Sequence, residues 1–228
     1  MSAESAVKGR SYVVSLDNRK ARGFGHERPA EILAAARDLF LERGVEQVTT
    51  RQIAARVGIS QTALYVYFET REQMLEKLAE DSWAGLGRAL DAVDPGCEAH
   101  ACAVGRLRAV LVAFMRFWLE HPDDYRIVFL RRALKPCAEA AHVLAPGETL
   151  LARLTGRIAE AAEAGALRCL GSAQATALSV WAAMSGMIGL RLRYPDFPWP
   201  PVDAHIEAMV ELILHGCTPA GAEPARAT

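Results

Sequence analysis

The sequence lacks the short motifs by which many enzymes and metalloproteins can be recognised. Its six histidines show no HExxH or other metal-ligand spacing, and it contains neither a nucleophile-elbow motif nor a glycine-rich phosphate loop. Its five cysteines are an odd set, and the nearest two, Cys97 and Cys102, are too far apart for a CxxC pair of zinc ligands. We therefore expect no enzyme activity, no metal and no cofactor.

An excess of charge of either sign is also missing. The net charge is −1; residues 1–77 carry 12 Lys and Arg against 10 Asp and Glu, and the rest of the chain carries 14 against 17. Any contact with nucleic acid must therefore use a local patch. The N-terminus has no apolar run of the kind found in secretory signals, so we expect a cytoplasmic protein with reduced cysteines.

One segment, residues 173–190, has no charged residue and just reaches the length of a membrane-spanning helix. It is rich in Ala, Ser, Thr and Gly rather than Leu and Phe, and nothing else in the chain resembles a span. We interpret it as a buried interface helix, and we expect no membrane partner.

What the sequence does contain is helical periodicity. Apolar residues at Ile32, Leu33, Ala36, Leu39 and Phe40 repeat with helical spacing, and Gly44 follows as a stop signal. No convincing period-2 strand and no internal repeat occur, so the sequence predicts an all-α fold. After the first helix, from residue 28, we expect helices over 50–57, 61–68, a stretch capped by Thr70, 98–120, 122–134, 147–164, 171–193 and 202–216.

The segment "TTRQIAARVGISQTALYVYF", residues 49–68, is typical of a helix-turn-helix. Gly58 stands where a left-handed backbone must end the second helix, and Ser60 is placed to cap the third. Ala54 is small at the expected helix crossing. The apolar positions that would pack both helices against the first are Ile53, Val57, Ile59 and Leu64.

The third helix carries polar and small residues that suit the major groove. Gln can pair bidentately with adenine, and Thr or Ala can contact a thymine methyl group. We expect base contacts from Gln61, Thr62, Ala63 and Tyr65, and phosphate contacts from Thr49, Thr50, Arg51, Tyr67 and Arg71. The alternative is a plain helical hairpin in which Tyr65 and Tyr67 are packed in the core.

Residues 35–75, "AARDLFLERGVEQVTTRQIAARVGISQTALYVYFETREQML", resemble the DNA-binding domain of the TetR family of transcriptional regulators. The matching positions are Thr49, Ile53-Ala54, Gly58-Ile59-Ser60, Leu64-Tyr65-Val66-Tyr67-Phe68 and Arg71. Gln61-Thr62 and Val66 depart from residues common in the family, so base preference cannot be carried over. Further on, "HPDDYRIVF" and "WAAMSG" are similar to one recurrent C-terminal domain, with Ser185 in place of a histidine.

The resemblance implies a domain plan and a double-stranded DNA partner. We expect a flexible basic arm at 1–26, which could contact phosphates through Lys8, Arg10, Arg19, Lys20 and Arg22 or simply be disordered. A three-helix helix-turn-helix domain at 27–77 would follow. A larger helical domain for effector binding and dimerisation would occupy 78–217, and a disordered tail 218–228.

The resemblance also implies a homodimer joined through the last two helices. Small residues on one helix would allow close approach, and an apolar stripe on the next would pack against the partner. The interface residues expected are Ala182, Gly186, Gly189, Ile206, Met209, Val210 and Ile213. The alternative is that these helices close only the core of their own protomer.

Aromatic residues are concentrated in the central helices, where they form either core or a ligand pocket. The residues concerned, beside Trp83, are Phe114, Phe117, Trp118, Tyr125, Phe129 and Trp181. By resemblance, the protein would be a repressor that a small apolar ligand releases from a near-palindromic operator. In the alternative mechanism, oxidation of a cysteine such as Cys97 or Cys102 replaces the ligand.

Overall fold

The computed structural model describes residues 28–93, 103–130 and 141–217. Within these ranges all regular structure is helical, which confirms the predicted all-α class. The arm and tail expected at 1–26 and 218–228 lie outside the described residues. The elements are α1 (Arg28–Arg43), the 3₁₀ turn η1 (Val45–Gln47), α2 (Thr50–Val57), α3 (Gln61–Tyr65), α4 (Arg71–Val93), α5 (Ala103–Glu120), α6 (Pro122–Leu130), α7 (Ala141–Glu163), α8 (Ala173–Arg193) and α9 (Val202–Gly216).

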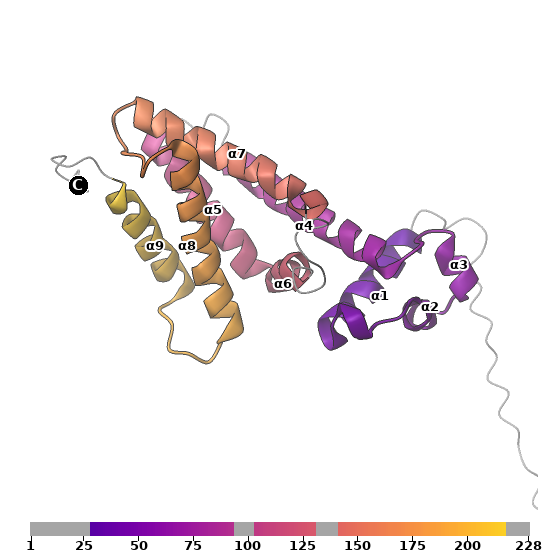
Figure 1. Cartoon of the computed structure of the whole chain (residues 1–228). Coiled ribbons are helices and arrows are strands. Elements are labelled where there is room, and N and C mark those ends of the chain that lie inside the picture. The colour runs from indigo at the N-terminus through magenta and orange to yellow at the C-terminus, as the bar shows by residue number, and fades with distance from the viewer. Residues whose placement is uncertain (1–27, 94–102, 131–140, 218–228) are drawn as a thin grey trace, which may run out of the picture.

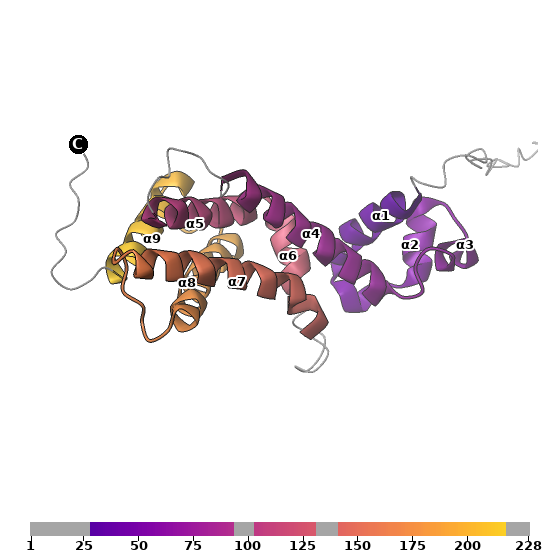
Figure 2. The same ribbon diagram turned by 90° about the horizontal axis from the view of Figure 1, so that it is seen from above.

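The molecule is elongated, and α4 runs from the group of α1 to α3 into the group of α5 to α9 (Figure 1). Helices α1 to α3 gather around the start of α4, and α5 to α9 lie around its remainder (Figures 1 and 2). Two hydrophobic cores meet within α4, where Leu78 belongs to the first and Ala79 to the second. We call the two parts the N-terminal unit and the C-terminal unit, and we propose that the domain border lies at this point.

Side-chain caps explain where several helices begin. Thr49 and Gln52 form a reciprocal capping box at α2, and Ser172 accepts a hydrogen bond from the backbone N–H of Ala175 at α8. Thr70 Oγ1 accepts from the N–H of Gln73, 3.0 Å away, at the start of α4. These caps satisfy N–H groups that have no partner inside the helix.

Two helix boundaries differ most from the sequence-based expectation. Helix α3 ends at Tyr65 instead of residue 68, because Tyr67 N–H and Phe68 N–H both bond to the carbonyl of Leu64 and form a turn. Helix α7 begins at Ala141, six residues earlier than predicted. The first part of the helix expected at 98–120 and the end of that expected at 122–134 lie outside the described residues.

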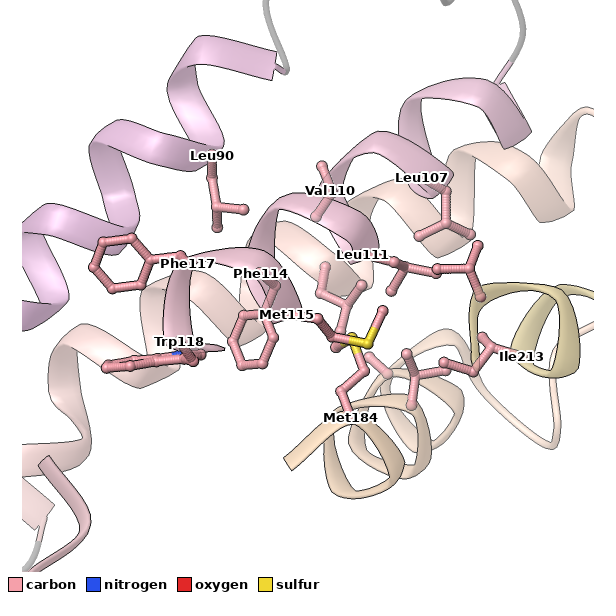
Figure 3. Packing of buried hydrophobic residues seen from close by; sticks show 14 of the residues in the cluster. Leu90, Leu107, Val110, Leu111, Phe114, Met115, Phe117, Trp118, Met184 and Ile213 are labelled. Carbon is pink, nitrogen blue, oxygen red and sulfur yellow. The ribbon is translucent and has the colours of Figure 1, made fainter. Parts of the chain in front are cut away.

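Helix α5 lies at the centre of the C-terminal unit and packs against α4, α7, α8 and α9. Its buried side chains meet Leu90 of α4, Met184 of α8 and Ile213 of α9 (Figure 3). Trp118 is fully buried, with ring centroids 5.1 to 6.4 Å from five aromatic neighbours in edge arrangements that such rings favour. The centre of this unit is therefore a packed aromatic core.

Candidate nucleic-acid interface

The turn between α2 and α3 depends on Gly58. Its φ of 74° and ψ of 32° lie in the left-handed region, which glycine adopts without a steric penalty. The N–H of Ile59 bonds to the carbonyl of Ala54 at 2.9 Å, and the N–H of Gly58 bonds to that of Ala55 at 3.2 Å, which is a Schellman ending. Ser60 Oγ then accepts from the N–H of Ala63 at 3.1 Å and starts α3.

Helix α3 is held by its buried side and presents the other side to solvent. Leu64 is fully buried in the core of the N-terminal unit, and Phe68 is also buried. Tyr65, Val66 and Tyr67 are 46%, 78% and 37% exposed. The alternative in which both tyrosines belong to the core is therefore wrong. In Figure 1, α3 lies at the outer end of the N-terminal unit, where a duplex could reach it.

Three of the expected DNA-contacting residues are bonded to one another. The side-chain amide of Gln61 donates to Thr50 Oγ1 at 3.0 Å and to the Tyr65 hydroxyl at 2.9 Å, and the two hydroxyl oxygens are 3.2 Å apart. This triangle ties the first turn of α2 to α3. Thr62 and Arg51 are exposed and Ala63 is half-buried, while the Thr49 hydroxyl is used in the α2 cap.

The guanidinium of Arg71 is engaged by backbone carbonyl groups of its own chain instead of being free at the surface for a phosphate. Its guanidinium donates to the carbonyl oxygens of Val45, Glu46 and Val48 at 2.9 to 3.2 Å and pairs with Glu72 at 2.7 Å. These bonds join the start of α4 to the end of η1. A role for Arg71 at phosphate stays a prediction.

Several residues expected in the dimer interface are buried within their own protomer. Ile206, Val210 and Ile213 are buried in the core of their own protomer, and Met209 is partly buried against it. A Cβ on Gly189 would lie 3.3 Å from the Tyr125 hydroxyl, so a neighbour within the same chain already fills that space. Ala182 and Gly186 are exposed. Three leucines on these two helices that no sequence pattern singled out, Leu178, Leu190 and Leu212, are exposed.

Helix α8 is also the one helix of the described residues that is long and apolar enough to cross a membrane, with 33% of its most apolar window buried. Its buried side closes the core through Ala177, Val180 and Met184. Length and composition alone are weak evidence for a span, because a helix with one side in a protein core and one against a partner has the same composition.

The expected pocket residues fall into different places. Phe114 and Trp181 line an apolar cavity of about 30 Å³ between α4, α5, α7 and α8, together with Trp83. Phe117 lines a separate cleft, and Trp118, Tyr125 and Phe129 line neither of these two cavities. Burial raises the pKa of Tyr125, whose hydroxyl donates to the Ser185 carbonyl at 3.2 Å.

The second cleft, of about 380 Å³, lies where the two units join. Arg37 of α1 pairs with Asp124 of α6 at 3.1 Å, and Ser82 of α4 donates to the same carboxylate at 3.1 Å. Asp81, Arg88 and His121 also line the cleft. No local sequence pattern indicates this group beyond an acidic first turn in α6, because its members come from distant parts of the chain.

Comparison with known proteins decides what kind of molecule this is. Residues 32–78 match the family described as "Bacterial regulatory proteins, tetR family", and residues 107–216 match "Tetracyclin repressor-like, C-terminal domain". The chain belongs to the TetR family. Both expected regions of resemblance are thereby confirmed at the level of the family.

Curated relatives match this TetR-family chain over its N-terminal part. It is 44% identical over 52 residues to the tetracycline repressor protein class A from transposon 1721 of Escherichia coli, which is 23% of this chain and 24% of the relative. It is 30% identical over 90 residues to the nucleoid occlusion factor SlmA of Haemophilus influenzae, 40% of each chain. The chain thus spans well under half of the length of these relatives.

Solved structures match nearly the whole TetR-family fold. One is a bacterial regulatory protein in the tetR family from Rhodococcus RHA1, with a TM-score of 0.67 and 24% identity, covering 84% of this chain and 97% of that one. Another is the MbdR regulator from Azoarcus sp. CIB, with a TM-score of 0.67 and 21% identity, covering 83% and 98%. At this identity the likeness shows the fold alone. Family membership makes the protein a DNA-binding transcriptional regulator rather than an enzyme.

Proposed function

We propose that this TetR-family protein is a cytoplasmic, homodimeric repressor that leaves a near-palindromic operator when a small apolar ligand enters its C-terminal unit. The observation that supports DNA reading most strongly is the exposed tip of α3, held by Gly58 and Ser60. The residues proposed to contact bases are Gln61, Thr62, Ala63 and Tyr65. The residues proposed to contact phosphates are Thr49, Thr50, Arg51, Tyr67 and Arg71.

The dimer proposal is supported by the outward side of α8. Leu178, Ala182, Gly186 and Leu190 follow one another at intervals of four residues, so they share a face, and all four are exposed. A Cβ on Gly186 would meet nothing within 4 Å in its own chain. An exposed apolar face with a small residue at its middle fits a second helix that approaches closely. A two-fold partner would place two α3 helices about one turn of DNA apart, roughly 34 Å.

Substitution of Gly186 tests the dimer. Gly186→Arg introduces a charge into the proposed interface without a clash in the protomer, so we expect monomers by light scattering after size-exclusion chromatography. Gly156→Arg is the matched control, because Gly156 is also an exposed helical glycine with open space around it, on α7. Dimers from both variants would contradict the interface.

The ligand proposal depends on the cavity lined by Trp83, Phe114 and Trp181. Its 30 Å³ is far below the roughly 300–1,000 Å³ of pockets for small molecules. A ligand must therefore part the helices around it. The indole N–H of Trp83 is buried without a hydrogen-bond partner among the described residues, so an apolar ligand with one acceptor would suit the site.

Opening this cavity would act on DNA binding through α4. Trp83 lies on the same helix as Leu75 and Leu78, which belong to the core of the N-terminal unit. A ligand shifts the equilibrium only if it binds the form that cannot hold the operator more tightly.

A cavity-filling variant tests ligand release. Leu151→Trp places bulk in the lining, so we expect operator binding to persist while release by an apolar compound that frees wild-type protein is lost. Leu170→Trp, at an exposed position away from the lining, should respond like wild type. Equal release of both variants, measured by fluorescence anisotropy of labelled operator, would contradict this site.

Cysteine oxidation receives less support from the described residues. Cys97 and Cys102 lie outside them. Burial and the neighbouring Cys169 raise the pKa of Cys217, and Arg168 partly offsets this effect. Cys217 therefore stays protonated more readily and is less reactive than an exposed cysteine. A cysteine-free variant that no longer loses operator binding under peroxide, while wild type does, would favour oxidation over the ligand.

A further inference from the structure

The side chains of Gln61, Thr50 and Tyr65 form a triangle of hydrogen bonds whose protons determine the orientation of the Gln61 amide. Three polar groups meet pairwise at 2.9, 3.0 and 3.2 Å. Each of these separations is within hydrogen-bond range, so each side of the triangle needs one proton between its two atoms. Counting protons fixes the orientation of the Gln61 amide.

With the amide nitrogen inward, the triangle is complete. The NH₂ group supplies two protons, one toward Thr50 Oγ1 and one toward the Tyr65 hydroxyl, and either hydroxyl supplies the third. With the amide turned over, only the two hydroxyl protons remain for the three contacts. One side of the triangle then has no proton, and two lone pairs face each other there. The first orientation is the stable one.

This orientation determines which group remains for a base. Both N–H donors of Gln61 are engaged within the chain, and its Oε1 is left as an acceptor beside the one hydroxyl proton that the triangle does not use. Bidentate pairing with adenine needs a Gln N–H for the base N7 as well as Oε1 for the base amino group. The expected bidentate contact is therefore not available while the triangle holds.

We propose that Gln61 reads the major groove only through its carbonyl oxygen, and that Thr50 and Tyr65 are positioning residues that impose this choice. In the major groove the hydrogen-bond donors are the amino groups of adenine and cytosine, whereas guanine and thymine present oxygen acceptors at the corresponding edge. Gln61 then selects an amino-bearing base, adenine or cytosine, and rejects guanine and thymine. This inference rests on the proposed function, in which α3 enters the groove.

The test uses the full-length protein and an operator obtained by selection from random duplexes. The Gln61 position is the one at which Gln61→Ala loses discrimination, and all four bases are then compared there by competition binding. For wild type we expect adenine and cytosine to bind within about threefold of each other and guanine and thymine to bind about tenfold or more weakly, since a good base contact is worth that much.

Thr50→Val removes one corner of the triangle with almost no change in shape. It frees one Gln61 N–H, so bidentate adenine pairing becomes possible and the preference should shift toward adenine over cytosine by about tenfold. Tyr65→Phe should shift it in the same direction. Tyr194→Phe is the control, because it removes the hydroxyl of an exposed tyrosine at the end of α8, outside the helix-turn-helix, and should leave the base order unchanged. Melting curves establish that each variant is folded.

Three results would overturn the inference. The first is a wild-type preference for adenine alone, and the second is an unchanged base order in Thr50→Val. The third is Gln61→Ala retaining discrimination at every position. If the folded wild-type dimer prefers no duplex at all, the proposed function fails together with the inference, whereas selective binding with the wrong base order contradicts only the inference.

Discussion

The left-handed backbone conformation of Gly58 determines the direction in which α3 follows α2. No atom outside its neighbours lies within 4 Å of a Cβ built there, so a side chain would find room but would have to adopt a φ of 74°. For a β-branched residue that conformation is strained. We therefore expect Gly58→Val to lower the free energy of unfolding by about 1–3 kcal/mol. Urea denaturation measures the change.

The control for Gly58 is Gly156, which has equally open surroundings but lies within α7 without a positive φ. Gly156→Ala should raise the unfolding free energy by about 0.5–1 kcal/mol, because alanine loses less backbone entropy in a helix. If both substitutions move stability in the same direction, the left-handed conformation is not what requires glycine at position 58.

Arg71 has an observed structural role and a predicted role at phosphate, and two substitutions can separate them. Its guanidinium holds three carbonyl groups at the end of η1, so Arg71→Ala should cost about 1–3 kcal/mol of unfolding free energy. If it also binds phosphate, the slope of log affinity against log salt should fall by about one, for all sequences alike. Arg71→Lys should restore the slope but not the stability. An unchanged slope in folded Arg71→Ala would leave Arg71 a purely structural residue.

Residues whose roles are local could be predicted from the sequence. Ser60 as a cap and Gly58 as a helix stop depend on neighbours within a few positions, and the structure has both as expected. The contacts of Arg71 could not be predicted in this way, because the three carbonyls lie 23 to 26 residues earlier and only the fold brings them near.

At the scale of elements, α9 shows that an apolar stripe does not reveal what the helix packs against. The stripe of Ile206, Val210 and Ile213 was correctly placed on one face, but it packs on α5 of the same chain. Ion pairs lie beside that face: Arg108 of α5 bonds to Glu207 and Glu211, and Arg116 bonds to Asp203. Periodicity identifies a buried face but does not distinguish a protomer core from a partner.

The turn between α8 and α9 is held by His205. Its Nδ1 lies 3.0 Å from a guanidinium nitrogen of Arg191, which also donates to the carbonyl of Pro200, and its ring stacks on Trp199 with centroids 5.6 Å apart. Burial, and then the positive charge of Arg191, lower the pKa of His205 below its ordinary value of 6.5. Neutral His205 can accept the Arg191 hydrogen bond.

Acidification should therefore weaken this corner. Below pH 6.5 the unfolded chain binds a proton at His205 more readily than the folded chain, so this contribution to stability is present at higher pH and is lost as the pH falls through that range. Denaturation at pH 7.5 and 5.5 should show a smaller loss for His205→Gln than for wild type. An equal loss in both proteins would mean that His205 does not couple folding to pH.

In the whole molecule, the two units are joined by α4 and by α6. Ile127 of α6 is buried in the core of the N-terminal unit, and Asp124 of α6 pairs with Arg37 of α1. The Arg37–Asp124 pair is partly exposed, so its direct contribution to stability is small, at most about 1 kcal/mol. This ion pair therefore does little to hold the two units at a fixed angle.

The sequence predicted the fold class and the helix-turn-helix because both follow from local patterns. It also predicted the aromatic centre around Trp118 as the more ordinary alternative to a pocket, and the packing agrees. It could not predict the size of the cavity near Trp181 or the cleft near Arg37. Those depend on how helices from distant parts of the chain pack together.

We propose that a rigid turn directs α3 of each protomer into a duplex. Selection of bound duplexes from a random pool at moderate ionic strength, with binding measured afterwards by footprinting, tests it most directly. We predict enriched sequences that share two inverted half-sites with centres about 10 base pairs apart. A folded, dimeric protein that enriches no sequence over the starting pool would contradict the account.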